Sequence, residues 1–298
     1  MNTRVNKSAP AAQPASSALV NPAIEPESTA LVKSALDDLD ISKYAGAGLE
    51  TAGAESFAIP FLRVIQKSSP EVDEVHARFM RDASAGMLLN TVTKELYDGK
   101  TGALFIPCHY ERKQLRWAPR GAAAQGYRGE VTETEALNLR VQGKIVDHEG
   151  RTYFTDDGRV DDKKNDRLVD TRLHFGLLLG VDGVPHQVLL ALVSTQIKKS
   201  KLFNSIQKER VRNVNGAVLQ EPSFLYAYRI TTTPESNQHG SWYGVHFALE
   251  GKVPSVAIFQ MAAAFYEALK RNEVKVDLAA AEEAGDAAAG GGGDPDKF

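Results

Sequence analysis

The chain has 298 residues, of which 43% are hydrophobic, and its formal net charge is −3. This length can bury a sizeable core, either as one large domain or as two small ones. The single cysteine, Cys108, excludes an internal disulfide, and the first thirty residues contain no apolar run typical of a signal peptide. No apolar stretch approaches the roughly 20 residues that cross a bilayer. These features predict a cytoplasmic protein without a membrane partner.

The charge is distributed unevenly along the chain. Residues 1–54 carry 4 Lys/Arg and 6 Asp/Glu, and residues 277–298 carry 1 and 6. The residues between them carry 30 and 26, a net charge of +4. Because local charge sets the attraction to phosphates, a mildly basic body with an acidic tail is compatible with a nucleic-acid partner. An acidic tail that only aids solubility is the alternative.

Composition divides the chain into three regions. Residues 1–54 begin with a run rich in Ala, Pro and Ser and are expected to be disordered, apart from a short helix over residues 29–39. Residues 55–276 are expected to form the folded domain. Residues 277–298, rich in Ala and Gly with scattered acids, are expected to form a flexible acidic tail.

The first half of the folded domain predicts β-structure. Residues 103–117 are consistent with one long strand, which follows a turn at residues 99–102. Residues 172–180 alternate between apolar and polar side chains, and residues 187–193 form a second apolar run. With Asp182 and Gly183 between them, these two runs predict a β-hairpin.

The second half adds a helix, another hairpin and a final helix. Residues 194–210 contain no Pro or Gly and place apolar residues on one side, so they predict a helix. Residues 224–230 and 243–249 alternate and predict two further strands, and residues 255–270 predict an amphipathic helix.

This order predicts a mainly β fold with accessory helices, in the α+β class. Strand, hairpin, helix, hairpin is the order of an OB-fold, a five-stranded barrel with a helix between strands 3 and 4. The helix over residues 255–270 and the long connection over residues 121–170 are then additions to the barrel. The pattern assigns no role to the second of these.

Rings alternate with cations in and just after the long strand predicted over residues 103–117. Such a mixture suits single-stranded nucleic acid, because aromatic faces stack on unpaired bases, at roughly 1–3 kcal/mol each, while cations neutralise the backbone. The window of residues 194–212 is the most basic in the chain and can line the same path. The residues predicted to bind DNA are Tyr110, Arg112, Lys113, Arg116, Trp117, Arg120, Lys198, Lys199 and Lys201. The alternative is that Trp117 and Tyr110 are core residues and the cations form a solvated face.

An acidic stretch offers a catalytic alternative, a Mg²⁺ site of a nuclease formed by Asp156, Asp157, Asp161, Asp162, Asp166 and Asp170. These acids are mixed with basic residues and lack the spacing of an EF-hand loop, which favours a solvated loop. One cysteine and seven scattered histidines provide no paired zinc ligands, and neither a Walker A loop nor a GxGxxG motif is present. We therefore expect no catalytic residue, no metal, no cofactor and no enzymatic activity.

The C-terminus ends in Asp294, Pro295, Asp296, Lys297 and Phe298. It resembles the acidic, Phe-terminated tails of bacterial and bacteriophage single-stranded DNA-binding proteins. The sequences AIPFL at 58–62, SPEV at 69–72, FIP at 105–107 and WAPR at 117–120 are similar to phage proteins often regarded as single-strand binders. The resemblance implies that the tail binds replication or recombination proteins through Asp294, Asp296 and Phe298, and that it competes with DNA for a basic groove. Lys297 weakens the negative field of this tail.

These observations predict a phage protein that coats single-stranded DNA in replication, recombination or repair, located in the host cytoplasm and compatible with a homo-oligomer. A phage structural or assembly protein is the first alternative. A metal-dependent nuclease or an annealing enzyme is the second.

Overall fold

The computed structural model describes residues 44, 47–52, 58–119, 126–180, 183–237 and 240–281. The chain divides into one unit over Met1–Thr51 and another over Ala52–Phe298, and the elements below belong to the second. The helix predicted over residues 29–39, most of the predicted N-terminal segment and nearly all of the predicted acidic tail lie outside the described residues.

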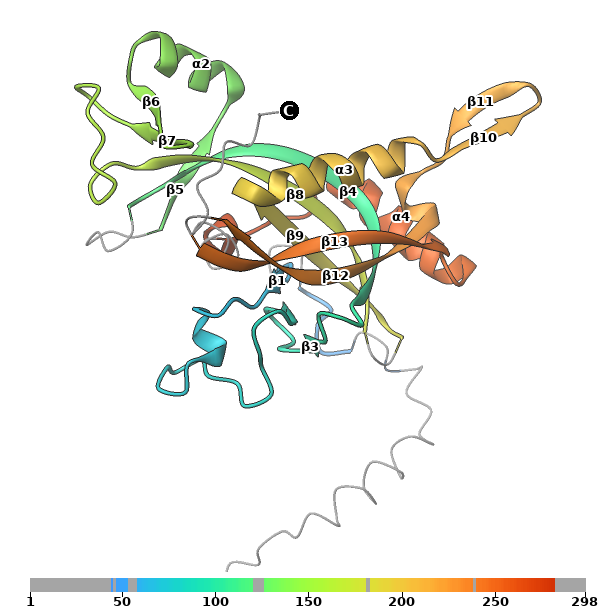
Figure 1. The fold of residues 1–298 in the computed structure, drawn as a ribbon. Helices are drawn as coiled ribbons and strands as arrows, with labels where there is room; N and C mark the ends of the chain where they lie inside the picture. Colours follow the sequence, from blue (N-terminus) through green and yellow to red (C-terminus); the bar gives the residue numbers. More distant parts are fainter. Residues whose placement is uncertain are drawn as a thin grey trace, which may run out of the picture. The chain divides into compact units, whose positions relative to one another are not determined.

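The largest sheet has eight strands in the order β13-β12-β4-β8-β7-β6, with β5 paired to β4 and β9 paired to β8 (Figure 1). Its strands are β4 (Ala103–Trp117), β5 (Tyr127–Val131), β6 (Ile145–His148), β7 (Arg151–Phe154), β8 (Arg167–Leu179), β9 (Pro185–Val193), β12 (Tyr226–Asn237) and β13 (Gly240–Lys252).

Smaller elements surround this sheet. The small strands are β1 (Leu62–Val64), β2 (Leu88–Asn90) and β3 (Leu96–Tyr97) in one sheet, and β10 (Val211–Val214) and β11 (Ala217–Gln220) in another. The α-helices are α2 (Glu133–Val141), α3 (Ile197–Lys208) and α4 (Val256–Lys270). The 3-10 helices are η3 (Pro70–Val72), η4 (Ser194–Gln196), η5 (Ser223–Leu225) and η6 (Leu278–Ala281).

The mainly β fold with accessory helices is confirmed, and so are both predicted hairpins, the helix between them and the C-terminal helix. The predicted closed five-stranded barrel is not confirmed. Among the described strands no ladder joins β9 to β13, so the large sheet is open. The sequence reasoning also missed the strands that lie between β4 and β8 in the chain.

Side-chain amides and β1 fill the gap between β9 and β13. The amide of Leu189 on β9 donates to the carbonyl of Pro60, 2.9 Å away, just before β1. Gln66 Nε2 donates to the carbonyl of Tyr243 at 2.8 Å, and the Tyr243 amide donates to Gln66 Oε1 at 2.7 Å. The Val245 amide donates to Gln196 Oε1 at 2.9 Å. These amides satisfy backbone groups of β13 that a neighbouring strand would otherwise pair.

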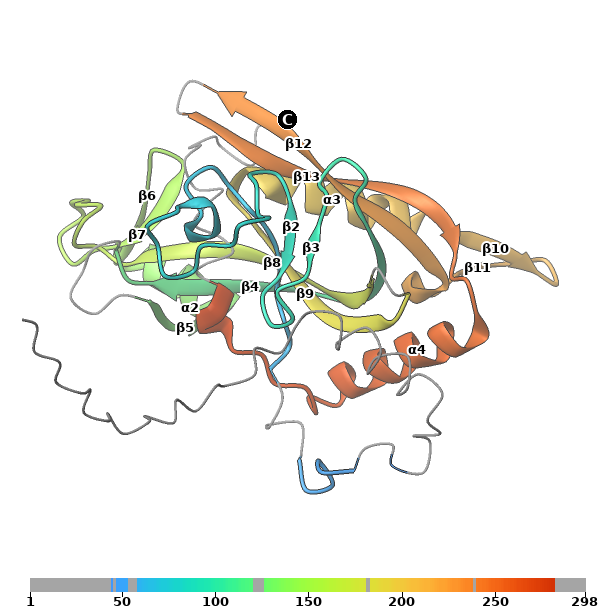
Figure 2. The same ribbon diagram turned by 90° about the horizontal axis from the view of Figure 1, so that it is seen from below.

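Two apolar clusters lie on opposite faces of the large sheet. Consecutive strand residues point to opposite faces, so Phe105 and Ile106 belong to different clusters. Phe105 packs with Phe203 of α3, whereas Ile106 belongs to the cluster that contains Phe265 of α4. Figure 2 shows α4 running along the face of the sheet that α3 does not cover. Full burial stabilises each such side chain by about 1.5–3 kcal/mol.

A bulge in β4 changes which residues face α4. The pairing with β8 shifts between Pro107 and His109, so Cys108 is the extra residue. Gly176 lies opposite Pro107, and a Cβ there would meet the carbonyl oxygen of Ile106 at 2.4 Å, which explains the glycine. Before the bulge the even-numbered Ile106 faces the apolar cluster that contains Phe265 of α4. After the bulge the odd-numbered residues, such as Leu115, face that cluster.

The connection from β4 to β8 is a folded insertion with its own small core. Val131, Ala136, Ile145 and Leu168 are buried together in it. Thr132 caps α2, accepting a hydrogen bond from the amide of Glu135 at 3.2 Å. The sequence Thr132-x-x-Glu135 is a capping-box pattern that predicts this helix start.

Among the described helices, none is long and apolar enough to span a membrane.

Candidate nucleic-acid interface

The DNA-binding candidates on β4 lie on two faces of the sheet. After the bulge, Tyr110, Arg112 and Arg116 point to the face that carries α3, whereas Lys113 and Trp117 point to the face that carries α4. The sequence prediction of one shared surface therefore applies to only part of the set.

Trp117 and Tyr110 differ in burial. Trp117 is 6% exposed and packs in the apolar cluster under α4, with its ring 5.4 Å from that of Tyr127. Its position provides no free face for a base. Tyr110 is half-buried, and its hydroxyl accepts a hydrogen bond from Arg172 Nη1 at 2.9 Å.

The cations on β4 are ion-paired with acids from the insertion and β8. Arg112 contacts Asp170 at 2.9 Å and Glu133 at 2.8 Å. The hydrogen bond to Asp170 is the main cause of a raised pKa for the Arg112 guanidinium. The Arg112 side chain is 41% exposed, and exposed pairs contribute about 0–1 kcal/mol, so its ion pairs stabilise the fold only slightly.

Lys113 and Arg116 are paired in the same way. Lys113 Nζ lies 2.9 Å from Glu130, and Arg116 Nε lies 2.6 Å from Asp166. Partial burial lowers the pKa of Lys113, but the hydrogen bond and the charge of Glu130 outweigh it and raise the pKa overall.

The α3 lysines lie on the same face as Tyr110. The ring of Tyr110 is 5.1 Å from that of His174 on β8, and His174 Nε2 is 2.8 Å from Ser200 Oγ on α3. Lys199 and Lys201 flank Ser200 in the chain, and Lys199 Nζ contacts Glu235 of β12 at 2.9 Å. Lys198 is half-buried and Lys201 is exposed. The structure thus places this helix beside the Tyr110 end of the cationic strand.

Four of the predicted residues cannot be placed. Arg120 and the proposed partner-binding residues Asp294, Asp296 and Phe298 lie outside the described residues.

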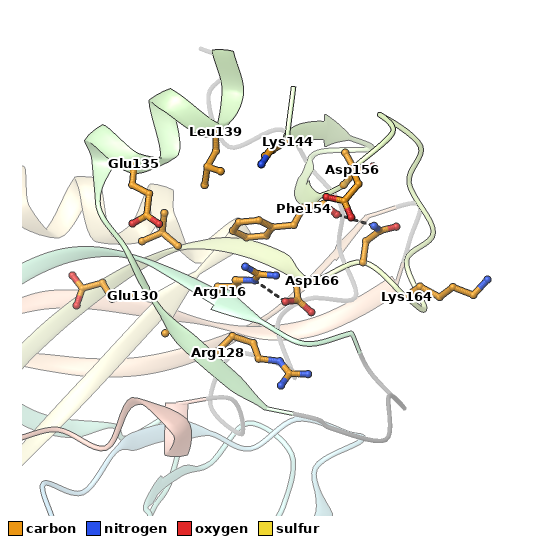
Figure 3. Close-up of a pocket in the computed structure, with 14 residues that line it drawn as sticks. Arg116, Arg128, Glu130, Glu135, Leu139, Lys144, Phe154, Asp156, Lys164 and Asp166 are labelled. Carbon is orange, nitrogen blue, oxygen red and sulfur yellow. Dashed lines mark hydrogen bonds and ion pairs between the residues drawn. The ribbon is translucent and has the colours of Figure 1, made fainter. Parts of the chain in front are cut away.

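The structure also contains a cavity that the sequence reasoning did not predict, here called the insertion pocket (Figure 3). Its volume is about 520 Å³, and β4, β5, α2 and residues 144–166 line it. Arg116 is the predicted DNA-binding residue that it contains. The guanidinium carbon of Arg116 lies 4.1 Å from the centroid of the Phe154 ring. No short motif marks this site, because its walls come from four separate segments.

The acidic stretch forms turns within the insertion. Asp157 Oδ1 accepts the amide of Arg159, and Asp161 Oδ1 accepts the amide of Lys163, both at 3.0 Å. The second of these bonds is the main cause of a lowered pKa for Asp161. Within the described part of the chain, no three His, Cys, Asp or Glu residues are grouped to hold a metal ion.

A family model for the Pam3 phage gp34-like proteins matches residues 27–275. No curated protein and no solved structure matches the chain.

Proposed function

The chain belongs to the Pam3 phage gp34-like family, and we propose on that premise that it is a non-catalytic phage protein that binds single-stranded DNA through an OB-like sheet. It would protect unpaired DNA during replication or recombination.

The order and pairing of the five longest strands carry this proposal. They follow one another as β4, β8, β9, then α3, then β12 and β13. The first of them, β4, pairs with both β8 and β12, while β8 pairs with β9 and β12 pairs with β13. This order and these pairings resemble those of an OB-fold and support the proposal. Among the described strands the ladder that closes such a barrel, between its third and fifth strands, is absent, and β1 with the side-chain amides of Gln66 and Gln196 lies there instead.

The positions of two connections give further support. OB-folds bind oligonucleotides with the face of strands 2 and 3 and with the loops joining strands 1–2 and 4–5. Here the corresponding connections are the insertion between β4 and β8 and the connection between β12 and β13. Both views place the insertion strands at the same end of the sheet as the end of β12 and the start of β13 (Figures 1 and 2). Because α4 packs on one face of β4 and β8, and α3 packs on the other face of β8 and β9, we assign DNA contact to the insertion and to the part of β4 on the α3 side that carries Tyr110, Arg112 and Arg116.

On that face, Arg112, Arg116 and the α3 lysines would neutralise phosphates, and the half-buried Tyr110 would supply an aromatic edge. The C-terminal residues Asp294, Asp296 and Phe298 would recruit replication or recombination proteins. This assignment rests on their acidic and aromatic character alone.

A titration of fluorescent oligo-dT followed by anisotropy tests the proposal. We expect binding at low salt, and log K should fall linearly with log salt at about 0.7 per phosphate neutralised. Absence of any uptake of oligo-dT at 20 mM salt, at micromolar protein, would reject single-strand binding.

A structural or assembly role is the second candidate, and the hairpin β10–β11 favours it. All eight strand residues of this hairpin are exposed, among them the apolar Val211, Val214, Val218 and Leu219. An isolated two-stranded hairpin is marginally stable in water, so contact with another copy of the chain would stabilise it. A salt-insensitive oligomer that ignores oligo-dT and dissociates in Val218→Ser/Leu219→Ser would favour this role over DNA binding.

A further inference from the structure

The insertion pocket combines an aromatic floor with a planar cation. Phe154 lies at the edge of the small core of the insertion and is half-buried. The Arg116 guanidinium lies over this ring, and its Nε is held by Asp166 at 2.6 Å (Figure 3). The Arg116 side chain nevertheless remains 43% exposed. A guanidinium fixed in this way is a rigid platform on which a nucleobase can stack.

Hydrogen bonds between its segments hold the pocket in shape. The Thr155 amide donates to the carbonyl of Lys144 at 2.9 Å, and the Phe154 amide donates to the carbonyl of Asp166 at 2.8 Å. Asn165 Nδ2 donates to the carbonyl of Phe154 at 2.7 Å. The walls are therefore preformed, and the volume lies within the roughly 300–1,000 Å³ typical of small-molecule sites.

The charges of the lining select a ligand of low charge. The cations Arg116, Arg128, Lys144 and Lys164 line the pocket together with the acids Glu130, Glu135, Asp156 and Asp166. Equal numbers of the two signs suit a ligand with one phosphate and a polar base better than a nucleoside triphosphate. The carboxylates can accept hydrogen bonds from base N–H groups, and the cations can meet the phosphate.

We propose that the insertion pocket binds one unpaired nucleotide of the DNA strand, with its base stacked on the Arg116 guanidinium above Phe154. This inference rests on the proposed function and deepens it, because it assigns the described part of the insertion, residues 126–166, to base contact. A strand that crosses the α3 face would place one nucleotide in the pocket, since Arg116 lies both on that face and in the pocket wall.

Arg116→Lys tests the stacking, because it keeps the positive charge beside Asp166 and removes the planar group. Anisotropy titrations use oligo-dT and an abasic oligonucleotide of the same length, which keeps the phosphates and lacks the bases. We expect Arg116→Lys to bind oligo-dT at least about fivefold more weakly, which is about 1 kcal/mol, and to bind the abasic strand as the wild type does.

Arg229→Lys is the matched control. Arg229 lies on β12 outside the proposed DNA face, and its ion-pair partner is the carboxylate of Glu250 rather than a ring. We expect Arg229→Lys to bind both oligo-dT and the abasic strand as the wild type does. Phe154→Leu, which keeps apolar volume at the edge of the small core, should weaken oligo-dT binding as Arg116→Lys does, and thermal melting establishes that each variant is folded.

The outcomes separate this inference from the proposed function. If the wild type binds oligo-dT and both Arg116→Lys and Phe154→Leu match it, the pocket assignment is overturned while single-strand binding stands. If the wild type does not bind oligo-dT, the proposed function of single-strand binding is rejected. An NMR titration with dTMP then tests by itself whether the pocket binds a nucleotide. Shifts of the Phe154 ring resonances that Arg116→Lys abolishes would retain the nucleotide site, and unshifted resonances would overturn it.

Discussion

His174 on β8 and Ser200 on α3 are joined by a buried hydrogen bond of 2.8 Å between Nε2 and Oγ. This bond fixes the N-terminal half of α3, with its lysines, beside Tyr110, whose ring lies 5.1 Å from that of His174. The imidazole also packs against Phe203 and Phe247. Two of the basic segments proposed to contact DNA are thus connected through one buried histidine.

Burial of His174 predicts a loss of stability in acid. Burial, followed by the charge of Arg172, lowers the pKa of His174 from its usual 6.5 to about 3. Between pH 6.5 and about 3 the unfolded state therefore binds more protons than the folded state. The stabilisation that the neutral, buried His174 contributes is complete above pH 6.5 and decreases as the pH falls towards 3. We expect the free energy of unfolding to fall by a few kcal/mol from this group, on the order of 3–5. Urea unfolding at pH 8 and pH 4 measures the loss, and His174→Gln, which can bond Ser200 but does not titrate, should lose less.

Arg112 tests the proposed DNA face, and Arg229, which lies outside that face, is its control. Each forms an exposed ion pair on the large sheet, Arg112 with Asp170 and Arg229 with Glu250. Arg112→Ala should weaken oligo-dT binding at low salt and reduce the salt slope by about 0.7, because one phosphate contact is lost. Arg229→Ala loses a comparable ion pair and should leave both values unchanged. Equal effects of the two substitutions in anisotropy titrations would argue against the assigned face.

Gln66 should stabilise the open side of the sheet through the backbone of Tyr243. Gln66→Ala removes partners from both an amide and a carbonyl, and each unsatisfied buried group costs about 1–3 kcal/mol. We expect the free energy of unfolding in urea to fall by about 2–4 kcal/mol. Lys67→Ala removes an exposed 3.2 Å contact to Ser241 and serves as the control, with a change within about 0.5 kcal/mol.

Substitutions at the helix caps of α2 and α4 test whether the insertion unfolds independently of the rest of the domain. Thr132 accepts from Glu135 at the start of α2, and Ser255 accepts from Ile258 at the start of α4. Loss of such a cap costs about 0.5–2 kcal/mol. Thr132→Ala should therefore speed hydrogen exchange in α2 and not in α4, and Ser255→Ala should do the reverse. Exchange that accelerates everywhere in both variants would show that the insertion does not unfold as a separate unit.

Deletion of residues 282–298 tests the proposed role of the C-terminal residues. If these acids compete with DNA for the cationic face, the shortened chain should bind oligo-dT more tightly at low salt, and the difference should shrink as salt screens the charges. Anisotropy titrations of both chains at two salt concentrations measure this. An unchanged affinity would contradict competition but not the recruitment of partners.

Much of the strand order could be predicted from local pattern. The alternation in β8 and the apolar run of β9 place both strands, and the absence of Pro and Gly together with apolar spacing places α3, because each pattern reflects contacts made within a few residues. The insertion was missed because its strands are short and its apolar residues sparse. The capping pattern at Thr132 is the signal that could have revealed α2.

The candidate site was predicted less completely than the fold. Arg112 and Arg116 were selected from one strand, but their partners Asp170 and Asp166 lie 58 and 50 residues further along the chain. Phe154, which supports Arg116 in the insertion pocket, carries no local sign of that role. Such pairings depend on which strands lie side by side, and sequence spacing contains no direct record of it.

The sequence by itself determined the mainly β character, the order of the long strands around α3 and the amphipathic helix α4. These follow from side-chain periodicity, a local property of the backbone. The tertiary structure alone decided which face each ring and cation occupies. One extra residue at Cys108 reverses the facing of β4, so that Trp117 is buried under α4 while Arg116 lines the insertion pocket. A shift of one residue moves every later side chain to the other face, and only the pairing with β8 shows where the shift occurs.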